Sequence, residues 1–187
     1  MKLIVGLGNP GKEYLLTRHN AGFIFLDTLV DSFNISDYKA KFQGAFTEGS
    51  IHGHDLFFLK PLTYMNLSGG SVAALCKFYK IPVEEILVVH DDVDVGLGKI
   101  KLKQGGGNAG HNGLKSLTAS LGPNFWRLRI GIDQKPERMD LSDYVLGNLP
   151  KSELATLQDL FEVMARNFDL LLEDKGSLFL TNVGIGK

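Results

Sequence analysis

The sequence predicts one α/β domain with three layers, in which helices cover both faces of a mixed β-sheet. Two short apolar runs, Leu3–Val5 and Ile86–Val89, have the composition of buried parallel strands. Segments in which apolar residues recur every three or four positions alternate with these runs and predict amphipathic helices. A hairpin pattern between them adds antiparallel strands, so the sheet is expected to be mixed.

Length and composition favour a single domain over residues 1–187. The chain has 187 residues, of which 44% are hydrophobic and 22% charged, enough for one sizeable core. It contains no apolar run of the about eighteen residues that span a bilayer, and Met1 and Lys2 lead directly into a strand rather than a signal peptide. We therefore expect a cytoplasmic protein with no membrane partner.

The first strand ends in a glycine-rich loop, and His19 follows just before the first predicted helix. Ligands bind at this end of the strands in open α/β sheets. Residues 6–11 also match the dinucleotide pattern G-x-G-x-x-G. However, Pro10 lacks the N–H that a pyrophosphate requires, and both acidic residues at the expected distance fall in a helical pattern. We therefore reject the dinucleotide motif, and a nucleotide-cofactor oxidoreductase stays only as a third alternative, which the absence of NAD binding would end.

A hairpin and a helix are predicted next. The segments Phe42–Ile51 and Leu56–Leu59 flank a short polar turn, as in a β-hairpin. Ser68 is a plausible N-cap for a helix that runs to Tyr79.

Cys76, on the apolar side of that helix, is the one cysteine of the chain, so an internal disulfide is excluded. A buried hydrophobic role is expected for it rather than a nucleophilic one.

The second half of the chain begins with alternating basic strands. Lysines occupy every second position of Lys99–Lys103, and Arg127–Ile130 repeats the alternation. A glycine-rich loop and a helix through Leu121 lie between them. The two basic faces are either solvated or, next to the exposed N–H groups of the loop, suited to bind phosphate. Because the net charge is only −1, such a local patch would have to hold any nucleic acid. Apolar spacing from Lys151 to Leu171 predicts one long amphipathic helix.

Polar side chains at three strand ends form the candidate site. If the first strand adjoins the strand that ends at Asp91, the carboxylate of Asp91 can fix the tautomer of His19 and stabilise its imidazolium. His19 would then activate water. Amides suit such a site because they offer donors and an acceptor without a charge change, and the candidates are Asn9, Asn66 and Asn112. A turn or capping role is the alternative for each amide.

Other polar residues near these strand ends are interpreted differently. His90 lies on the opposite side of its strand from Asp91 and is expected to be a satisfied structural histidine. His111, in the glycine-rich loop, is left open between lining the pocket and having no role there. Asp92 and Asp94 hint at a calcium loop, but the bidentate glutamate and a third acidic position are missing. We therefore predict no metal site.

Several segments together resemble the bacterial-type peptidyl-tRNA hydrolases. The resemblance runs from the first strand to the last helix. The segments that carry it are Val5–Gly11, Thr17–Gly22, Lys60–Gly69, His90–Asp94, Gly110–Ser116 and Phe125–Ile132. It implies a compact monomer with a twisted mixed sheet and no cofactor, which hydrolyses the ester between a peptide and the 3′-terminal ribose of tRNA and rescues peptidyl-tRNAs dropped by stalled ribosomes.

The resemblance also implies a role for each candidate residue. His19 would be the general base with Asp91 as its partner, and Asn9 would distinguish blocked from free aminoacyl groups. The remaining residues would contact substrate. Those expected to hold substrate and water or to line the pocket are Tyr14, Tyr64, Met65, Asn66, His111 and Asn112, and those suited to tRNA phosphate are Lys103 and Arg129.

One departure from the family pattern lies in the glycine-rich loop. The family usually has a histidine and a glycine where this chain has Asn108 and Ala109. If a positive φ is required at Ala109, alanine costs about 1 kcal/mol there. We expect this change to tune loop mobility rather than abolish activity. The alternative function is a non-catalytic RNA-binding protein with the same fold, which would not need His19, Asp91 and the three amides.

Overall fold

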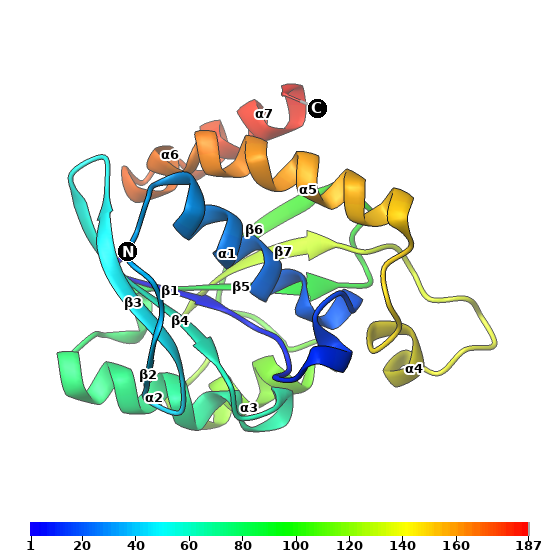
Figure 1. Ribbon diagram of the computed structural model, residues 1–187, viewed down its shortest axis with the longest axis horizontal. Coiled ribbons are helices and arrows are strands. Elements are labelled where there is room, and N and C mark those ends of the chain that lie inside the picture. The colour runs from blue at the N-terminus through cyan, green and yellow to red at the C-terminus, as the bar shows by residue number, and fades with distance from the viewer. Residues whose placement is uncertain (187) are drawn as a thin grey trace.

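The computed structural model describes residues 1–186 and contains one seven-stranded sheet with the order β2-β3-β4-β1-β5-β7-β6 (Figure 1). Strands β4, β1, β5 and β7 are parallel to one another, whereas β2, β3 and β6 add antiparallel pairs. The mixed sheet that the sequence predicts is therefore confirmed. The strands are β1 (Leu3–Gly6), β2 (Lys39–Lys41), β3 (Gly44–Ile51), β4 (His54–Pro61), β5 (Ile86–Asp92), β6 (Ile100–Gln104) and β7 (Trp126–Gly131).

Helices cover both faces of the sheet and complete three layers. Helices α1, α5, α6 and α7 lie on one face, and α2 and α3 on the other (Figure 1). The helices are α1 (Ala21–Ser32), α2 (Ser68–Tyr79), α3 (Asn112–Leu121), α4 (Leu141–Val145), α5 (Lys151–Arg166), α6 (Phe168–Leu172) and α7 (Gly176–Ile185). Short 3-10 turns are η1 (Lys12–Tyr14), η2 (Arg18–Asn20), η3 (Met65–Leu67) and η4 (Val83–Glu85).

Strand β5 shows why its sequence is apolar throughout. Leu87 and Val89 belong to the core beneath α1 and α5, while Ile86 and Val88 belong to the core beneath α2 and α3. All four side chains are fully buried, and each such burial stabilises the fold by about 1.5–3 kcal/mol. Because both faces of the strand are covered, the polar residues at its carboxyl end are held on a rigid support.

Gly6, the last residue of β1, allows the strand to pack closely against α1. A Cβ at Gly6 would lie 2.4 Å from the carbonyl oxygen of Gly22 in α1, so strand and helix can approach only without it. The chain then enters the short turn η1, and the first α-helix does not begin until Ala21. The loop of residues 6–11 therefore does not lead directly into an α-helix, as the loop of the dinucleotide motif does, which agrees with rejecting that motif.

Two predictions about helices are wrong in detail, and the prediction that Cys76 is buried is confirmed. The helix expected from Lys151 to Leu171 is interrupted at Asn167, whose side chain donates to the Val163 carbonyl at 2.8 Å and separates α5 from α6. Ser68 is not an N-cap: its hydroxyl donates to the Met65 carbonyl at 2.8 Å. Cys76 is buried, and burial raises the pKa of its thiol to about 11, as a non-nucleophilic residue requires.

Among residues 1–186, no helix has both the length and the apolar character needed to cross a bilayer.

Candidate active site

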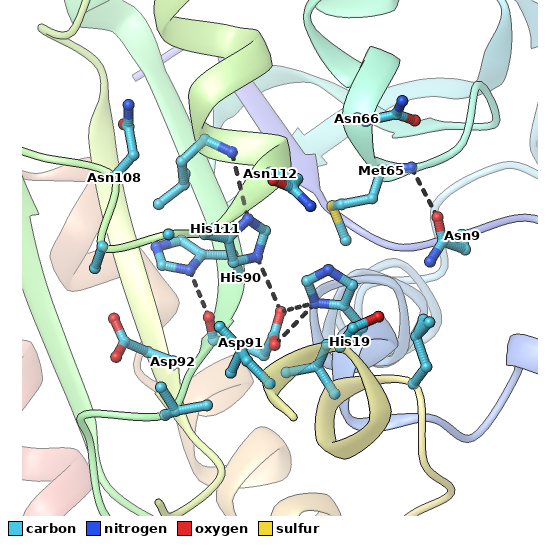
Figure 2. A pocket seen from close by; sticks show the side chains of 18 of the residues that line it. Asn9, His19, Met65, Asn66, His90, Asp91, Asp92, Asn108, His111 and Asn112 are labelled. Carbon is cyan, nitrogen blue, oxygen red and sulfur yellow. Dashed lines mark hydrogen bonds and ion pairs between the residues drawn. The ribbon is translucent and has the colours of Figure 1, made fainter. Parts of the chain in front are cut away.

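A cleft of about 560 Å³ opens at the carboxyl ends of β1 and β5. Figure 2 shows the side chains that line it, which come from the loops after β1, β4 and β5, from the glycine-rich loop and from α4. All the substrate-binding and catalytic candidates from the sequence line it. They are Asn9, Tyr14, His19, Tyr64, Met65, Asn66, Asp91, His111 and Asn112.

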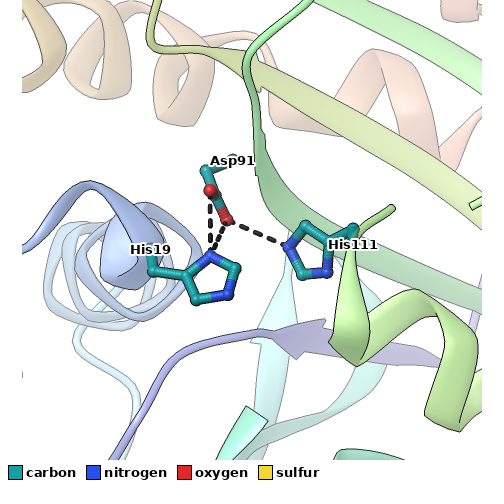
Figure 3. Close-up of side chains that lie close together, drawn as sticks. All are labelled: His19, Asp91 and His111. Atoms are coloured by element: carbon teal, nitrogen blue, oxygen red, sulfur yellow. Dashed lines mark hydrogen bonds and ion pairs between the residues drawn. The ribbon is translucent and has the colours of Figure 1, made fainter. Parts of the chain in front are cut away.

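His19 and Asp91 meet at the floor of this cleft. The turn η2 carries His19 at the start of α1, and Asp91 lies near the end of β5, which runs parallel to β1. His19 Nδ1 is 2.9 Å from both carboxylate oxygens of Asp91. The side chains are buried, and the other ring nitrogen of His19 points away from Asp91 (Figure 3). The contact that the sequence predicts is therefore present.

The surroundings of this pair favour an ionised carboxylate. Burial opposes charge on His19, but the negative charge and hydrogen bond of Asp91 outweigh it and raise the pKa of His19 above its ordinary 6.5. For Asp91, burial favours the neutral acid. The charges and hydrogen bonds of His19 and His111 overcome this effect and hold the pKa of Asp91 well below its usual range. Asp91 can thus stabilise a proton on His19.

His111 is a second partner of Asp91 that the sequence did not reveal. Its Nε2 lies 3.0 Å from Asp91 Oδ1, and its Nδ1 accepts the backbone N–H groups of Gly113 and Leu114 at 3.1 and 3.3 Å (Figure 3). Since Nδ1 accepts, Nε2 carries the proton and donates it to Asp91. His111 is therefore the N-cap of α3, and Asn112, for which capping was an alternative, is the first helical residue.

The tautomer of His111, with its proton on Nε2, disfavours metal binding at this cluster. The ligand atoms of His19, Asp91 and His111 lie within 4.8 Å of one another, a spacing that a metal ion could bridge. A metal at Nε2 of His111 would require that nitrogen to lose its proton, and Nδ1 would then have to accept two N–H groups while carrying a proton itself. The helix cap therefore favours hydrogen bonding over metal coordination at this cluster.

Asn9 is held rigidly with its amide donor toward the cleft. Its side-chain oxygen accepts the Met65 N–H at 2.7 Å, which fixes the orientation of the amide (Figure 2). Asn20 exchanges hydrogen bonds of 2.8 and 3.0 Å with the Asn9 backbone. Sequence reasoning missed Asn20, although a buried amide directly after His19 was the available signal. The Nδ2 group of Asn9 remains free to donate to a ligand.

The other amides and the aromatic residues form the walls. Met65 is the buried first residue of η3, whereas Asn66 and Asn112 are exposed in the cleft. Tyr14 is half-buried. Tyr64 is exposed with a φ of 62°, a left-handed conformation that few non-glycine residues adopt. The walls thus combine amide donors and acceptors with apolar and aromatic surface. This combination suits a ligand with a polar backbone and apolar substituents.

His90 is not fully satisfied, contrary to the prediction. Its Nδ1 donates to the Asp91 carbonyl oxygen at 2.7 Å, but its buried Nε2 lacks a hydrogen-bond partner among residues 1–186. Its ring centroid lies 5.0 Å from that of His111. Burial, followed by repulsion from His111, lowers the pKa of His90 to about 3. His90 is therefore neutral, and its role is to pack in the interior and bond the Asp91 backbone.

This lowered pKa makes the folded state sensitive to acid. In the unfolded chain His90 binds a proton below about pH 6.5, whereas in the folded chain it does so only near pH 3. Stability is consequently lost as pH falls through this window. We expect His90→Asn to reduce the loss between about pH 7 and about pH 4.5 by on the order of 2 kcal/mol, measured by urea unfolding. His54→Asn is the control and should lose as much unfolding free energy on acidification as the wild type. The same loss in His90→Asn would refute this account.

The glycine-rich loop has the strain anticipated at Ala109. Its φ is 46°, in the left-handed region, and the neighbouring Gly110 has a φ of 77°. Asn108 does not share this conformation. Its side-chain oxygen accepts from Thr118 Oγ1 at 3.0 Å and from Arg127 at 3.2 Å. The chain therefore tolerates alanine at a position where glycine is intrinsically preferred.

Ala109→Gly is expected to stabilise the protein. Glycine removes about 1 kcal/mol of left-handed strain, and its greater freedom in the unfolded chain returns about half of that. The net gain of about 0.5 kcal/mol is measurable by urea unfolding. Ala155→Gly in α5 is the matched control and should destabilise by about 1 kcal/mol. A stability loss of similar size at both positions would contradict the assignment.

The basic residues divide into three environments. Lys103 is exposed, and its Nζ would lie 2.6 Å from a Cβ placed on Gly106. Arg129 is half-buried, with its Nε 2.8 Å from Asp92 Oδ2, and keeps its terminal nitrogens for another ligand. Arg127 differs from the prediction of a basic face, because it is only 2% exposed. The two alternatives, a solvated face or a phosphate-binding one, therefore stay open for Lys103 and Arg129, whereas Arg127 is too buried for either.

Together, the mixed sheet and the buried histidine–carboxylate pair in an open cleft define an α/β protein with a site suited to general-base catalysis. Comparison with known proteins gives the family. Residues 3–183 match the family model described as "Peptidyl-tRNA hydrolase". The chain belongs to the peptidyl-tRNA hydrolase family.

Individual relatives agree over nearly the whole chain. The chain is 49% identical to the peptidyl-tRNA hydrolase of Rickettsia bellii (strain RML369-C) over 176 residues, which cover 94% of this chain and 95% of that protein. It is 46% identical to that of Rickettsia canadensis (strain McKiel), covering 98% and 100%. The crystal structure of peptidyl-tRNA hydrolase from Acinetobacter baumannii has a TM-score of 0.91 and 43% identity, covering 98% of this chain and 94% of that one.

Proposed function

We propose that this protein hydrolyses the ester bond between the peptide and the tRNA of peptidyl-tRNA, with His19 as the general base. The observation that carries the proposal is His19 itself. One nitrogen is held by Asp91 at 2.9 Å, and the other faces a cleft large enough for the end of a peptide and a ribose (Figure 2). Membership of the peptidyl-tRNA hydrolase family supports this substrate.

In the proposed mechanism, water is the nucleophile. Neutral His19 accepts a proton from water at Nε2 while the water oxygen attacks the ester carbonyl carbon. Asp91 stabilises the imidazolium that forms. The tetrahedral intermediate then collapses, the bond to the 3′ oxygen of the ribose breaks, and His19 returns the proton to that oxygen. The products are a peptide with a free carboxyl group, which then loses its proton to solvent, and a tRNA that can be charged again.

The other residues bind and orient the substrate in this proposal. Asn9 donates its fixed Nδ2 group to the peptide backbone and so distinguishes blocked from free aminoacyl groups. Asn66 and Asn112 orient substrate and water, and donate to the developing oxyanion. His111 holds Asp91. Tyr14, Tyr64 and Met65 line the pocket, and Lys103 and Arg129 bind tRNA phosphate. The proposed mechanism uses no cofactor.

We further propose that residues 1–187 act as one domain and as a monomer in the cytoplasm. The continuous seven-stranded sheet supports the single domain. Gel filtration with light scattering tests the oligomeric state, and a dimer at assay concentrations would contradict it.

The decisive experiment compares N-blocked and unblocked aminoacyl-tRNA. We expect the wild-type protein to release the blocked amino acid at least about a hundredfold faster than the free one, because only the blocked substrate presents a backbone carbonyl and no ammonium charge to Asn9. Binding of tRNA without release of either would instead indicate the non-catalytic RNA-binding alternative. Equal release of both would refute the proposed role of Asn9.

A further inference from the structure

Arg127 is a buried cation with an unusual set of partners. It lies on β7, is 2% exposed, and takes part in none of the ion pairs among residues 1–186. Its terminal nitrogens donate to the carbonyl oxygens of Gly106 at 3.0 Å, Gly107 at 2.6 Å and Pro123 at 3.4 Å. Its guanidinium also lies 4.4 Å from the ring centre of Phe125. A buried charge without a counter-ion is expensive, so a specific role is expected of it.

Arg127 fixes the glycine-rich loop that leads to the cleft. Besides the two loop carbonyls, it donates to Asn108 Oδ1 at 3.2 Å, and Thr118 of α3 donates to the same oxygen at 3.0 Å. The backbone oxygen of Asn108 accepts the N–H of His111 at 2.8 Å. Through these contacts the position of His111, and hence its hydrogen bond to Asp91, depends on the conformation of the loop.

The other end of the loop lies beside the proposed phosphate-binding residues. Lys103 pairs in register with Arg127 across β6 and β7, and its side chain lies against Gly106. Gly106 has a φ of 101°, so a β-carbon there would meet both strain and the lysine. Figure 2 places Asn108 on the far side of His111 from His19. One short loop thus connects Lys103 to the hydrogen bonds around Asp91.

We propose that Arg127 is a positioning residue that, with Asn108 and Thr118, couples phosphate binding at Lys103 to the alignment of His111 and Asp91 in the cleft. The inference rests on the proposed function, since it concerns how the tRNA part of the substrate influences hydrolysis of the ester. In this proposal Arg127 itself contacts neither the tRNA phosphate nor the ester. The histidine that the family usually has at this position could not accept from both donors in the same way as the amide oxygen of Asn108, which this chain uses for the coupling.

The test removes these contacts one at a time, beginning with Thr118, which does not line the cleft. Thr118→Val deletes the hydroxyl that binds Asn108, and Asn108→Ala deletes the shared oxygen. With peptidyl-tRNA we expect kcat to fall about threefold and about tenfold, respectively, with KM changed less than about twofold. Thr118→Ser, which restores the hydroxyl, should recover the wild-type kcat. Thr156→Val in α5, which also deletes one hydroxyl bond of 3.0 Å, is the matched control and should leave kcat unchanged.

A double-mutant cycle tests the coupling itself. In the wild-type background, Lys103→Ala is expected to lower kcat/KM about tenfold, but in the Asn108→Ala background only about threefold. Independent, multiplicative effects would overturn the inference, as would an unchanged kcat in Thr118→Val or Asn108→Ala. If the wild-type protein released no peptide, the proposed function would fail instead, so the two failures are distinguishable.

Discussion

His19→Ala is expected to lower kcat for peptidyl-tRNA hydrolysis about a thousandfold, with KM changed only a few-fold. General-base catalysis by a positioned histidine contributes about 10²–10⁴ to the rate. Among residues 1–186, His19 is the one imidazole that is held by Asp91 and has its second nitrogen free toward the cleft. The measurement is single-turnover release of peptide from purified peptidyl-tRNA, which separates chemistry from product release.

A folding defect must be excluded for this variant. His19 belongs to η2 and its side chain makes no backbone hydrogen bond among the described residues, so circular dichroism and the affinity for tRNA should match the wild type. His54→Ala, a partly exposed histidine of β4, is the matched control and should keep full activity. Turnover by His19→Ala within about tenfold of the wild type would show that another group activates the water.

Asp91→Asn is expected to lower kcat by about a hundredfold or more while the protein still folds. The amide fills the same space and can still accept the Nδ1–H of His19, but it cannot stabilise the imidazolium electrostatically. Whichever way the amide turns, its NH2 group faces a protonated ring nitrogen, either Nε2 of His111 or Nδ1 of His19. Both effects weaken the alignment of the base. Rapid-quench measurement of peptide release under saturating enzyme tests this expectation.

A neighbouring acid provides the control for charge loss. Asp94 is exposed and lies three residues beyond Asp91 on the same segment. Asp94→Asn removes an equal charge near the cleft and should change kcat less than about twofold, since exposed charges are screened by solvent. Comparable losses in Asp91→Asn and Asp94→Asn would mean that the carboxylate of Asp91 has no special relation to His19.

Much of the fold could be predicted because its signals are local. The apolar runs of β1 and β5 and the alternation in β6 are local patterns that report burial directly. The meeting of His19 with Asp91 followed from a topological rule, namely that the carboxyl ends of adjoining parallel strands lie together. The strained φ at Ala109 was likewise predictable, because the family pattern has glycine there.

The rest depended on long-range contacts that no local pattern encodes. Arg127 alternates with apolar residues exactly as a solvated strand would, and only the loop carbonyls folded over it make it buried. His111 caps α3 and binds Asp91 at the same time, a double role set by loop geometry. Helix α7 and the short elements β2 and α4 gave no pattern strong enough to assign.

The pH dependence of kcat/KM in the wild type and in Asp91→Asn tests the central claim most directly. Because Asp91 raises the pKa of His19, and the base must be neutral to accept a proton, wild-type kcat/KM should rise with pH and level off after a midpoint above 6.5. In Asp91→Asn, burial remains without the carboxylate, so the midpoint should move to lower pH. A midpoint that is the same in both proteins, or a flat profile from about pH 5 to about pH 9, would contradict His19 as a general base held by Asp91.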